Sequence, residues 1–242
     1  MGITWGTVSI ILLLSLGESV HKNMMSKFSA IGENVVAVWR GRTTKAYKGY
    51  GVKREIRFTD DDIPLILSKV PQIRYVDMVF QKNAILKNGD KSFSQPLSGV
   101  SPEYHLIRNI DPQSESRFIN QQDILLKRRV IFLGDTLAKD LFGTTKVIGK
   151  TVSIDRAIFT VIGVMEKKSS DSDFGGRDTN IGFIPRTTFK SMFSAKYPRI
   201  MVYQLKDAKN SQLAHDNLLL ALSKKYEFDP TDQEALPKWD ST

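Results

Sequence analysis

The sequence predicts an α+β fold in which a long N-terminal helix precedes a domain of two similar halves and an inserted section. Three observations support this prediction. The chain opens on an uncharged apolar run at residues 3–16, strand–helix–strand patterns lie at residues 35–80 and 200–239, and the section between them is rich in short strands. Two such halves around a section of different texture indicate an α+β sandwich whose connecting loop carries an inserted subdomain.

The composition indicates a folded protein and excludes several kinds of chemistry. Of the 242 residues, 41% are hydrophobic, which is enough for a sizeable core. The chain contains no cysteine, so a disulfide framework, a thiolate nucleophile and a cysteine metal site are excluded. The formal net charge is +9, but the basic residues are scattered between acidic ones. We therefore expect a solvated surface, compatible with nearby anionic lipid headgroups, and no nucleic-acid partner.

The apolar run at residues 3–16 is the most informative segment of the chain. It is shorter than the roughly 20 residues that a complete membrane span needs. A secretory signal is disfavoured because no basic residue precedes the run and no small-residue cleavage pattern follows it. We predict that residues 1–16 are the C-terminal part of a first transmembrane helix. A buried N-terminal helix of a soluble protein stays open as an alternative.

The helical period continues beyond this segment, through residues 17–33, and Gly32 favours an end there. Residues 3–31 would thus make one helix of roughly 43 Å, at 1.5 Å per residue. We predict that residues 17–33 form a stalk with an apolar stripe on one face, away from the charged residues. The stripe, which we assign to packing against a partner helix, consists of Val20, Met24, Phe28 and Ile31.

Residues 34–82 form the predicted first half of the α+β part. Strands are expected at 35–39 and 73–80, with a helix between them that Pro71 ends. Thr59 is a good N-cap for this helix, and the aspartates at 60–62 occupy its first turn, where the helix dipole favours anions. That position explains the three aspartates without a metal ion. The apolar residues that repeat at helical spacing are Ile63, Ile66, Leu67 and Val70.

Residues 83–190 are predicted to be an inserted β-rich subdomain, and residues 191–242 the second half. The insert has strands at 130–133, 152–164 with a break at 155–156, and 181–184, together with a helix over 135–142 that Gly143 closes. The second half has a strand at 200–205, a helix at 211–226 and a short strand near 235–239.

Several short motifs occur at spacings typical of one protein family. They are GITWG at 2–6, GEN at 32–34, FTDDDI at 58–63, GVSPEY at 99–104, RFIN at 117–120 with Asp123, VIFLG at 130–134, LFG at 141–143, and IGK through FTVIGV within 148–164. The chain resembles the periplasmic core domain of MacB-type ABC transporter permeases, a group that includes FtsX-like and LolC-like permeases. It departs from the family at Ser116 and at Asp155-Arg156, where glycine is usual, which puts the local turn geometry in doubt.

The resemblance implies both an architecture and a function. The two halves would form a porter-like subdomain and residues 83–190 a Sabre-like insert, between the first and second of four membrane helices. The domain would lie on the periplasmic or extracellular face of the bacterial inner membrane and would have no catalytic centre. It would transmit movement, driven by ATP hydrolysis in a separate domain or subunit, to a periplasmic partner or substrate. The implied partners are an ABC ATPase, a second permease copy and a periplasmic adaptor protein.

No catalytic, cofactor or metal site is predicted from the residues themselves. The GKT triplet at 149–151 supplies only the end of a phosphate-binding loop, and a strand follows it. The DFG triplet at 173–175 lacks the other kinase motifs, and the three histidines are expected at the surface. Two alternatives stay open: a module that binds a lipid, peptide or adaptor in the cleft between subdomains, and a membrane-anchored hydrolase.

Overall fold

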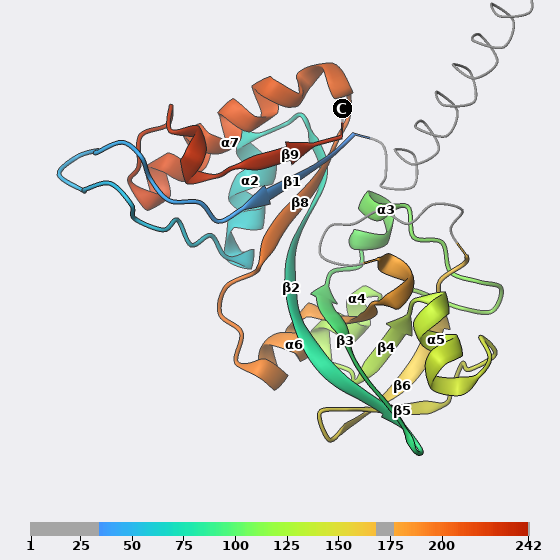
Figure 1. Cartoon of the computed structure of the whole chain (residues 1–242). Coiled ribbons are helices and arrows are strands. Elements are labelled where there is room, and N and C mark those ends of the chain that lie inside the picture. Colours follow the sequence, from blue (N-terminus) through green and yellow to red (C-terminus); the bar gives the residue numbers. More distant parts are fainter. Residues whose placement is uncertain (1–33, 168–176, 242) are drawn as a thin grey trace, which may run out of the picture.

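The computed structural model describes residues 34–167 and 177–241 (Figure 1). The predicted membrane segment and the stalk residues Val20, Met24, Phe28 and Ile31 lie outside these ranges, as does the DFG triplet. Within the described ranges, no helix combines the length and the apolarity that crossing a membrane requires.

Nine strands follow one another in a single sheet order, β3-β7-β4-β6-β5-β2-β8-β1-β9. The strands are β1 Val35–Trp39, β2 Ile73–Asn88, β3 Lys91–Val100, β4 Val130–Leu133, β5 Thr151–Ile154, β6 Ala157–Val164, β7 Gly182–Pro185, β8 Ile200–Leu205 and β9 Lys238–Asp240. The α-helices are α2 Ile63–Lys69, α3 Tyr104–Arg108, α4 Gln121–Leu125, α5 Asp135–Phe142, α6 Arg186–Phe193 and α7 Ser211–Tyr226. Short 3₁₀ turns are η1 Asp60–Asp62, η2 Asp178–Asn180, η3 Ala208–Asn210 and η4 Gln233–Ala235.

One end of the molecule is an antiparallel sheet in the order β2-β8-β1-β9 (Figure 1). Its two strand–helix–strand units interleave, because β8 lies between β1 and β2. The helices α2 and α7 pack against each other, and α3 contacts β2 and β8. In β1, Val36 and Val38 join the core under α2 and α7, whereas Val35 and Ala37 join the core that includes α3. Both faces of β1 are therefore covered, which explains its continuous apolar run.

The other end is a small closed barrel. The pairings β2–β3, β3–β7, β7–β4, β4–β6, β6–β5 and β5–β2 form a ring of six strands. Side chains fill the interior: a Cβ added to Gly182 would lie 3.0 Å from Ile131 Cδ1 and 3.2 Å from Leu97 Cδ1. Four strands of the ring thus meet tightly at this glycine, with Leu86 of β2 as the fourth contributor.

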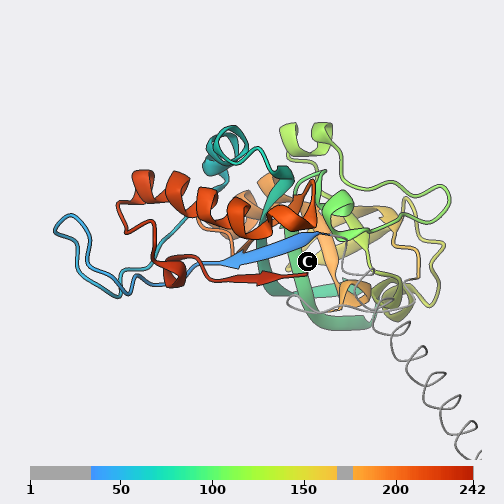
Figure 2. The same ribbon diagram turned by 90° about the horizontal axis from the view of Figure 1, so that it is seen from above.

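The long strand β2 belongs to both parts (Figures 1 and 2). It pairs with β8 through Val79 and with β3 from Phe80 onward. The strand predicted at 73–80 is therefore too short, and the hairpin that β2 forms with β3 was not predicted. Polar residues such as Lys82 and Asn83 hide the strand pattern in β2, and Pro96 hides it in β3.

The two ends of the described chain meet at one end of the antiparallel sheet. The Val35 amide donates to Ser241 Oγ at 3.0 Å, and the Ser241 amide donates to the Val35 carbonyl at 3.0 Å. Helix α7 begins at the same place, because the Ser211 hydroxyl donates to the carboxylate of Asp240. The loop between β1 and α2 lies at the opposite end of this sheet (Figure 1).

Candidate docking groove and sheet junction

The predicted cap at Thr59 is present, but residues 60–62 form the 3₁₀ turn η1, and helix α2 itself begins at Ile63. The buried carboxylate of Asp62 accepts the Thr59 amide at 2.7 Å, which completes a reciprocal cap. Asp62 also accepts the Tyr226 hydroxyl at 2.6 Å and forms an ion pair with Lys225. Burial and the hydrogen bond to Asp62 raise the pKa of Tyr226, so its hydroxyl stays a donor. These contacts bind the start of α2 to the end of α7.

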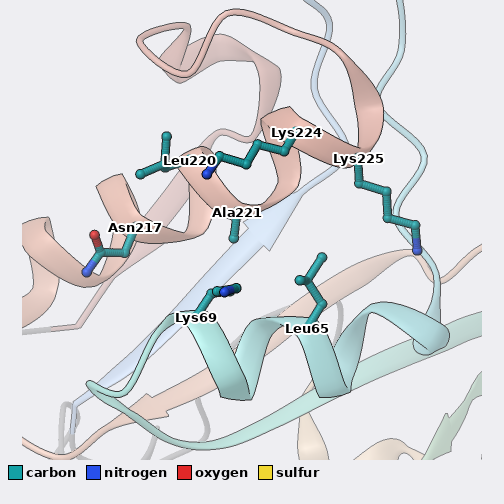
Figure 3. Close-up of a pocket in the computed structure, with 7 residues that line it drawn as sticks. All are labelled: Leu65, Lys69, Asn217, Leu220, Ala221, Lys224 and Lys225. Atoms are coloured by element: carbon teal, nitrogen blue, oxygen red, sulfur yellow. The ribbon is translucent and has the colours of Figure 1, made fainter.

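A groove of about 410 Å³ lies between α2 and α7 (Figure 3). Leu65 and Lys69 line it from α2, where they are one turn apart. The residues that line it from α7 are Asn217, Leu220, Ala221, Lys224 and Lys225. Figure 3 shows the Lys224 side chain lying along α7 above Ala221, with Lys69 opposite on α2.

The groove has an apolar floor and a cationic rim. Leu220 is 46% exposed, and Leu213, two turns earlier on α7, is 51% exposed. In the part of the chain that the structure describes, neither Lys69 nor Lys224 has a carboxylate partner, whereas Lys225 has Asp62. Apolar side chains beside unpaired cations are typical of a surface that binds another molecule.

A second cavity, of about 370 Å³, lies on the other side of α2, between this helix and the barrel end of the molecule. Ile63 and Leu67 line it from α2, and Gln121 and Arg186 line it from α4 and α6. Leu67 is one of the apolar residues that the sequence places at helical spacing with Ile66, and its side chain is 45% exposed in this cavity. Helix α2 therefore presents one face to the groove and another to the junction.

Asp77 of β2 forms the core of this junction. Its carboxylate accepts the amides of Ser101 at 2.9 Å and Met78 at 2.8 Å, and Arg186 Nη1 lies 3.4 Å away. Burial raises the pKa of the Asp77 carboxyl to about 6, against the lowering effect of Arg186 and the two amides. The residue is fully engaged by its neighbours, so it offers no support for an acid or base of a hydrolase.

The RFIN motif has a structural role in this junction region. Arg117 donates two hydrogen bonds to the buried carboxylate of Asp123, at 2.6 and 3.2 Å. Asp123 also accepts the Asn120 amide at 3.0 Å, and Asn120 Oδ1 accepts the Asp123 amide in return, which caps α4. Burial alone would raise the pKa of Asp123, but the Arg117 hydrogen bonds and the Asn120 amide lower it below the usual range. The motif is therefore a folding signature.

The GKT triplet and His215 also have structural explanations. The GKT triplet leads into strand β5, as expected, and not into a helix. His215 was expected at the surface, but it is only 1% exposed on the buried face of α7. Burial, together with the positive charge of Lys238, lowers the pKa of His215 to about 4. Among residues 34–167 and 177–241, no cluster of potential metal ligands occurs.

The motifs and the fold agree with a comparison against known families. The model of the MacB-like periplasmic core domain matches residues 1–219 of the chain. The chain belongs to this family. The MacB-like core domain is the extracytoplasmic part of an ABC transporter permease, as the motifs implied.

Longer proteins similar to this chain carry the names of exporters. "Macrolide export ATP-binding/permease protein MacB" of Chlorobium phaeobacteroides is 28% identical over 190 residues, which are 78% of this chain and 28% of the relative. "Pyoverdine export ATP-binding/permease protein PvdT" of Pseudomonas aeruginosa is 24% identical over 240 residues, which are 98% of this chain and 35% of the relative. The chain thus spans about a third of the length of these relatives.

Solved structures share the fold. The periplasmic region of MacB from Actinobacillus actinomycetemcomitans has a TM-score of 0.68 at 22% identity, covering 88% of this chain and 92% of that one. The extracellular domain of the ABC-type transporter YknZ, from Gram-positive bacteria, has a TM-score of 0.69 at 18% identity, covering 85% and 100%.

The groove was not predicted from the sequence, because it depends on how α2 and α7 pack. A signal for it exists in α7. Leu213 and Leu220 add a second apolar stripe beside the buried one, which contains Leu218 and Leu222.

Proposed function

We propose that the chain transmits movement from the membrane to a periplasmic partner or substrate, in efflux or in lipoprotein or envelope transport. The meeting of Val35 and Ser241 is the observation that carries this proposal. Segments before β1 and after β9 would leave from one point, as a domain inserted between two membrane helices requires. The groove and the barrel extend away from that point. ATP hydrolysis would occur in a separate domain or subunit, and a second permease copy would complete the pump.

The change of partner along β2 supports the proposed subdomains. Residues 34–82 and 191–242 would be the porter-like part, because their strands pair with one another in the antiparallel sheet. Residues 83–190 would be the Sabre-like insert, because their strands complete the barrel. The ion pair between Asp77 and Arg186 then joins β2, where the chain leaves the porter-like part, to the start of α6, where the chain returns toward it.

The proposed route of the movement is the stalk, residues 17–33, which would continue the membrane helix of residues 1–16 into the domain. Charged substitutions on its apolar stripe, at Val20, Met24 and Phe28, would disrupt packing against the second stalk or the other permease copy. In the complete transporter in membrane vesicles, V20D, M24D and F28D should stop transport while ATP hydrolysis continues. Asn23→Asp, off the stripe, is the matched control. Transport that survives the stripe substitutions would refute the assignment, and Ile31 would be tested in the same way.

The absence of a catalytic centre in this domain is tested directly. The purified 242-residue chain should hydrolyse no ATP above the background of a mock preparation. Turnover at a rate comparable to an ABC ATPase would overturn the proposal.

A second candidate function is that of a module that binds a ligand or an adaptor protein, with mechanical coupling secondary. The α2–α7 groove favours it, because its apolar floor and cationic rim are open to solvent. In this case substitutions in the groove should impair transport even when the stalk substitutions do not. Among residues 34–167 and 177–241, no comparable observation favours the membrane-anchored hydrolase.

A further inference from the structure

We propose that the α2–α7 groove binds an acidic amphipathic helix of a soluble partner protein. The inference deepens the binding role above. It uses the proposed extracytoplasmic position only to choose between a protein and a membrane surface as the occupant.

The shape of the groove suits a helix. The helices α2 and α7 run antiparallel, since Asn217, in the middle of α7, donates to Gln72 just beyond the end of α2, whereas Lys225, near the end of α7, pairs with Asp62 directly before α2. A third helix packs into the furrow between two such neighbours by the same ridges-into-grooves geometry that packs helices in protein interiors. The stretch of α7 from Leu213 to Lys224 contains 12 residues and is about 16 Å long, which is about three turns of a partner helix.

The apolar part of the groove indicates that the occupant is amphipathic. Leu65, Leu220 and Ala221 form the floor, and Leu213 continues it toward the start of α7. A partner helix would cover the exposed parts of Leu213 and Leu220 with its own apolar stripe. Residues at i, i+3, i+4 and i+7 of the partner would supply that stripe, as in other helix-in-groove complexes.

The rim indicates that the occupant is acidic. Lys69 and Lys224 face each other across the groove and have no carboxylate partner among the described residues (Figure 3). Glutamates or aspartates on both flanks of the partner's apolar stripe would complement Lys69 and Lys224.

The position of the lysines favours a protein over the membrane. Helix α7 starts beside Asp240 and Val35, where both ends of the described chain lie. Lys224 is 13 residues farther along, or about 20 Å away from that end. If both ends lead to the bilayer, Lys224 lies about 20 Å from it along α7, within reach of a soluble partner.

Binding is measured by fluorescence anisotropy with the purified 242-residue chain in detergent. The probe is a labelled 18-residue synthetic helix with leucine on one face and glutamate on the flanks, and a lysine-for-glutamate analogue is its charge control. The K69E/K224E variant reverses the charge at the two rim positions. K87E/K146E makes the same charge change on exposed lysines of the barrel end and is the matched control. Leu220→Asn tests the floor, with Leu125→Asn, at an exposed leucine of α4, as its control.

We expect the acidic helix to bind and the lysine analogue not to bind. K69E/K224E should weaken binding at least tenfold and Leu220→Asn about fivefold, whereas the two control variants should change it less than twofold. Binding that K87E/K146E weakens as much as K69E/K224E would overturn the proposal, as would no binding at all. In a last experiment, binding of the chain to phosphatidylglycerol vesicles is measured. Vesicle binding that depends on Lys69 and Lys224 would assign the groove to the membrane instead. None of these outcomes depends on whether the domain transmits movement.

Discussion

The Asp77 carboxylate on β2 and the Arg186 guanidinium at the start of α6 approach each other to 3.4 Å at the junction of the antiparallel sheet and the barrel. Asp77 precedes the point where β2 changes partners, and Arg186 directly follows β7, the last strand of the barrel. The pair thus connects the segment of β2 that leads into the barrel with the start of α6, where the chain leaves the barrel. Because the carboxylate is fully buried, its ionisation is coupled to the stability of the junction.

The first prediction concerns Asp77 and pH. Its folded pKa of about 6 lies above the ordinary value of 3.8, so the folded protein binds the proton more tightly than the unfolded chain. The contribution of Asp77 to the free energy of unfolding therefore falls as the pH rises from about 4 to about 6, by at most about 1.4 kcal/mol per pH unit. Urea unfolding of the wild type and of Asp77→Asn across this range measures it. A difference between the two proteins that does not change with pH would contradict the prediction.

The second prediction concerns His215, whose pH dependence has the opposite sign. Its folded pKa of about 4 lies below the ordinary value of 6.5, so the unfolded chain binds the proton more tightly. The contribution of His215 to stability is complete above pH 6.5 and is lost as the pH falls toward 4. His215→Gln should therefore remove the loss of stability that His215 causes at acidic pH. In the wild type, the opposite pH dependence of Asp77 partly offsets this loss. In urea titrations, Asp77→Asn should gain stability with rising pH between 4 and 6, and His215→Gln should lose it.

The third prediction concerns the cap of α4. Asp123→Ala would leave Arg117 without its main acceptor, and the Asn120 amide would lose its partner. The Arg117 side chain is 42% exposed and can be solvated by water, so the loss comes mainly from the cap of α4, and we expect a cost of about 1–2 kcal/mol in the free energy of unfolding. Chemical denaturation at pH 7 checks this loss. Asp90→Asn, at the exposed tip of the β2–β3 hairpin, is the control and should change stability by less than about 0.5 kcal/mol. An equal effect of both substitutions would show that Asp123 is not a folding residue.

The fourth prediction concerns the two-residue turn between β5 and β6. Asp155 has φ of 43° and Arg156 has φ of 78°, so both occupy the left-handed region that glycine prefers. Arg156→Gly should raise the free energy of unfolding by about 0.5 kcal/mol, because strain relief outweighs the entropy cost of glycine. Asp155→Gly should give no such gain, because the Asp155 carboxylate accepts the Ile85 amide at 2.9 Å. Thermal unfolding distinguishes the two, and a higher melting temperature for Asp155→Gly than for Arg156→Gly would refute this account.

Local signals in the sequence are enough to predict many of the elements. The cap at Thr59, the apolar run of β1 and the turn at 155–156 all depend on neighbouring residues, and the structure confirms them. The insertion of β8 between β1 and β2 depends on strands more than 100 residues apart, so no local pattern predicts it. The hairpin of β2 and β3 was missed because one side of it is polar. The groove was missed for the same nonlocal reason, since Lys69 and Lys224 come together only through packing.

The hydrogen bonds between Val35 and Ser241 also determine how force would travel through the domain. A pull applied to both ends of the described chain reaches β1 and β9 side by side, at one edge of the same antiparallel sheet. The tension then does not cross the core from one pole to the other. It leaves the barrel and the α2–α7 layer unstretched, so the domain would swing as one body about its attachment while keeping the shape of its distant surfaces.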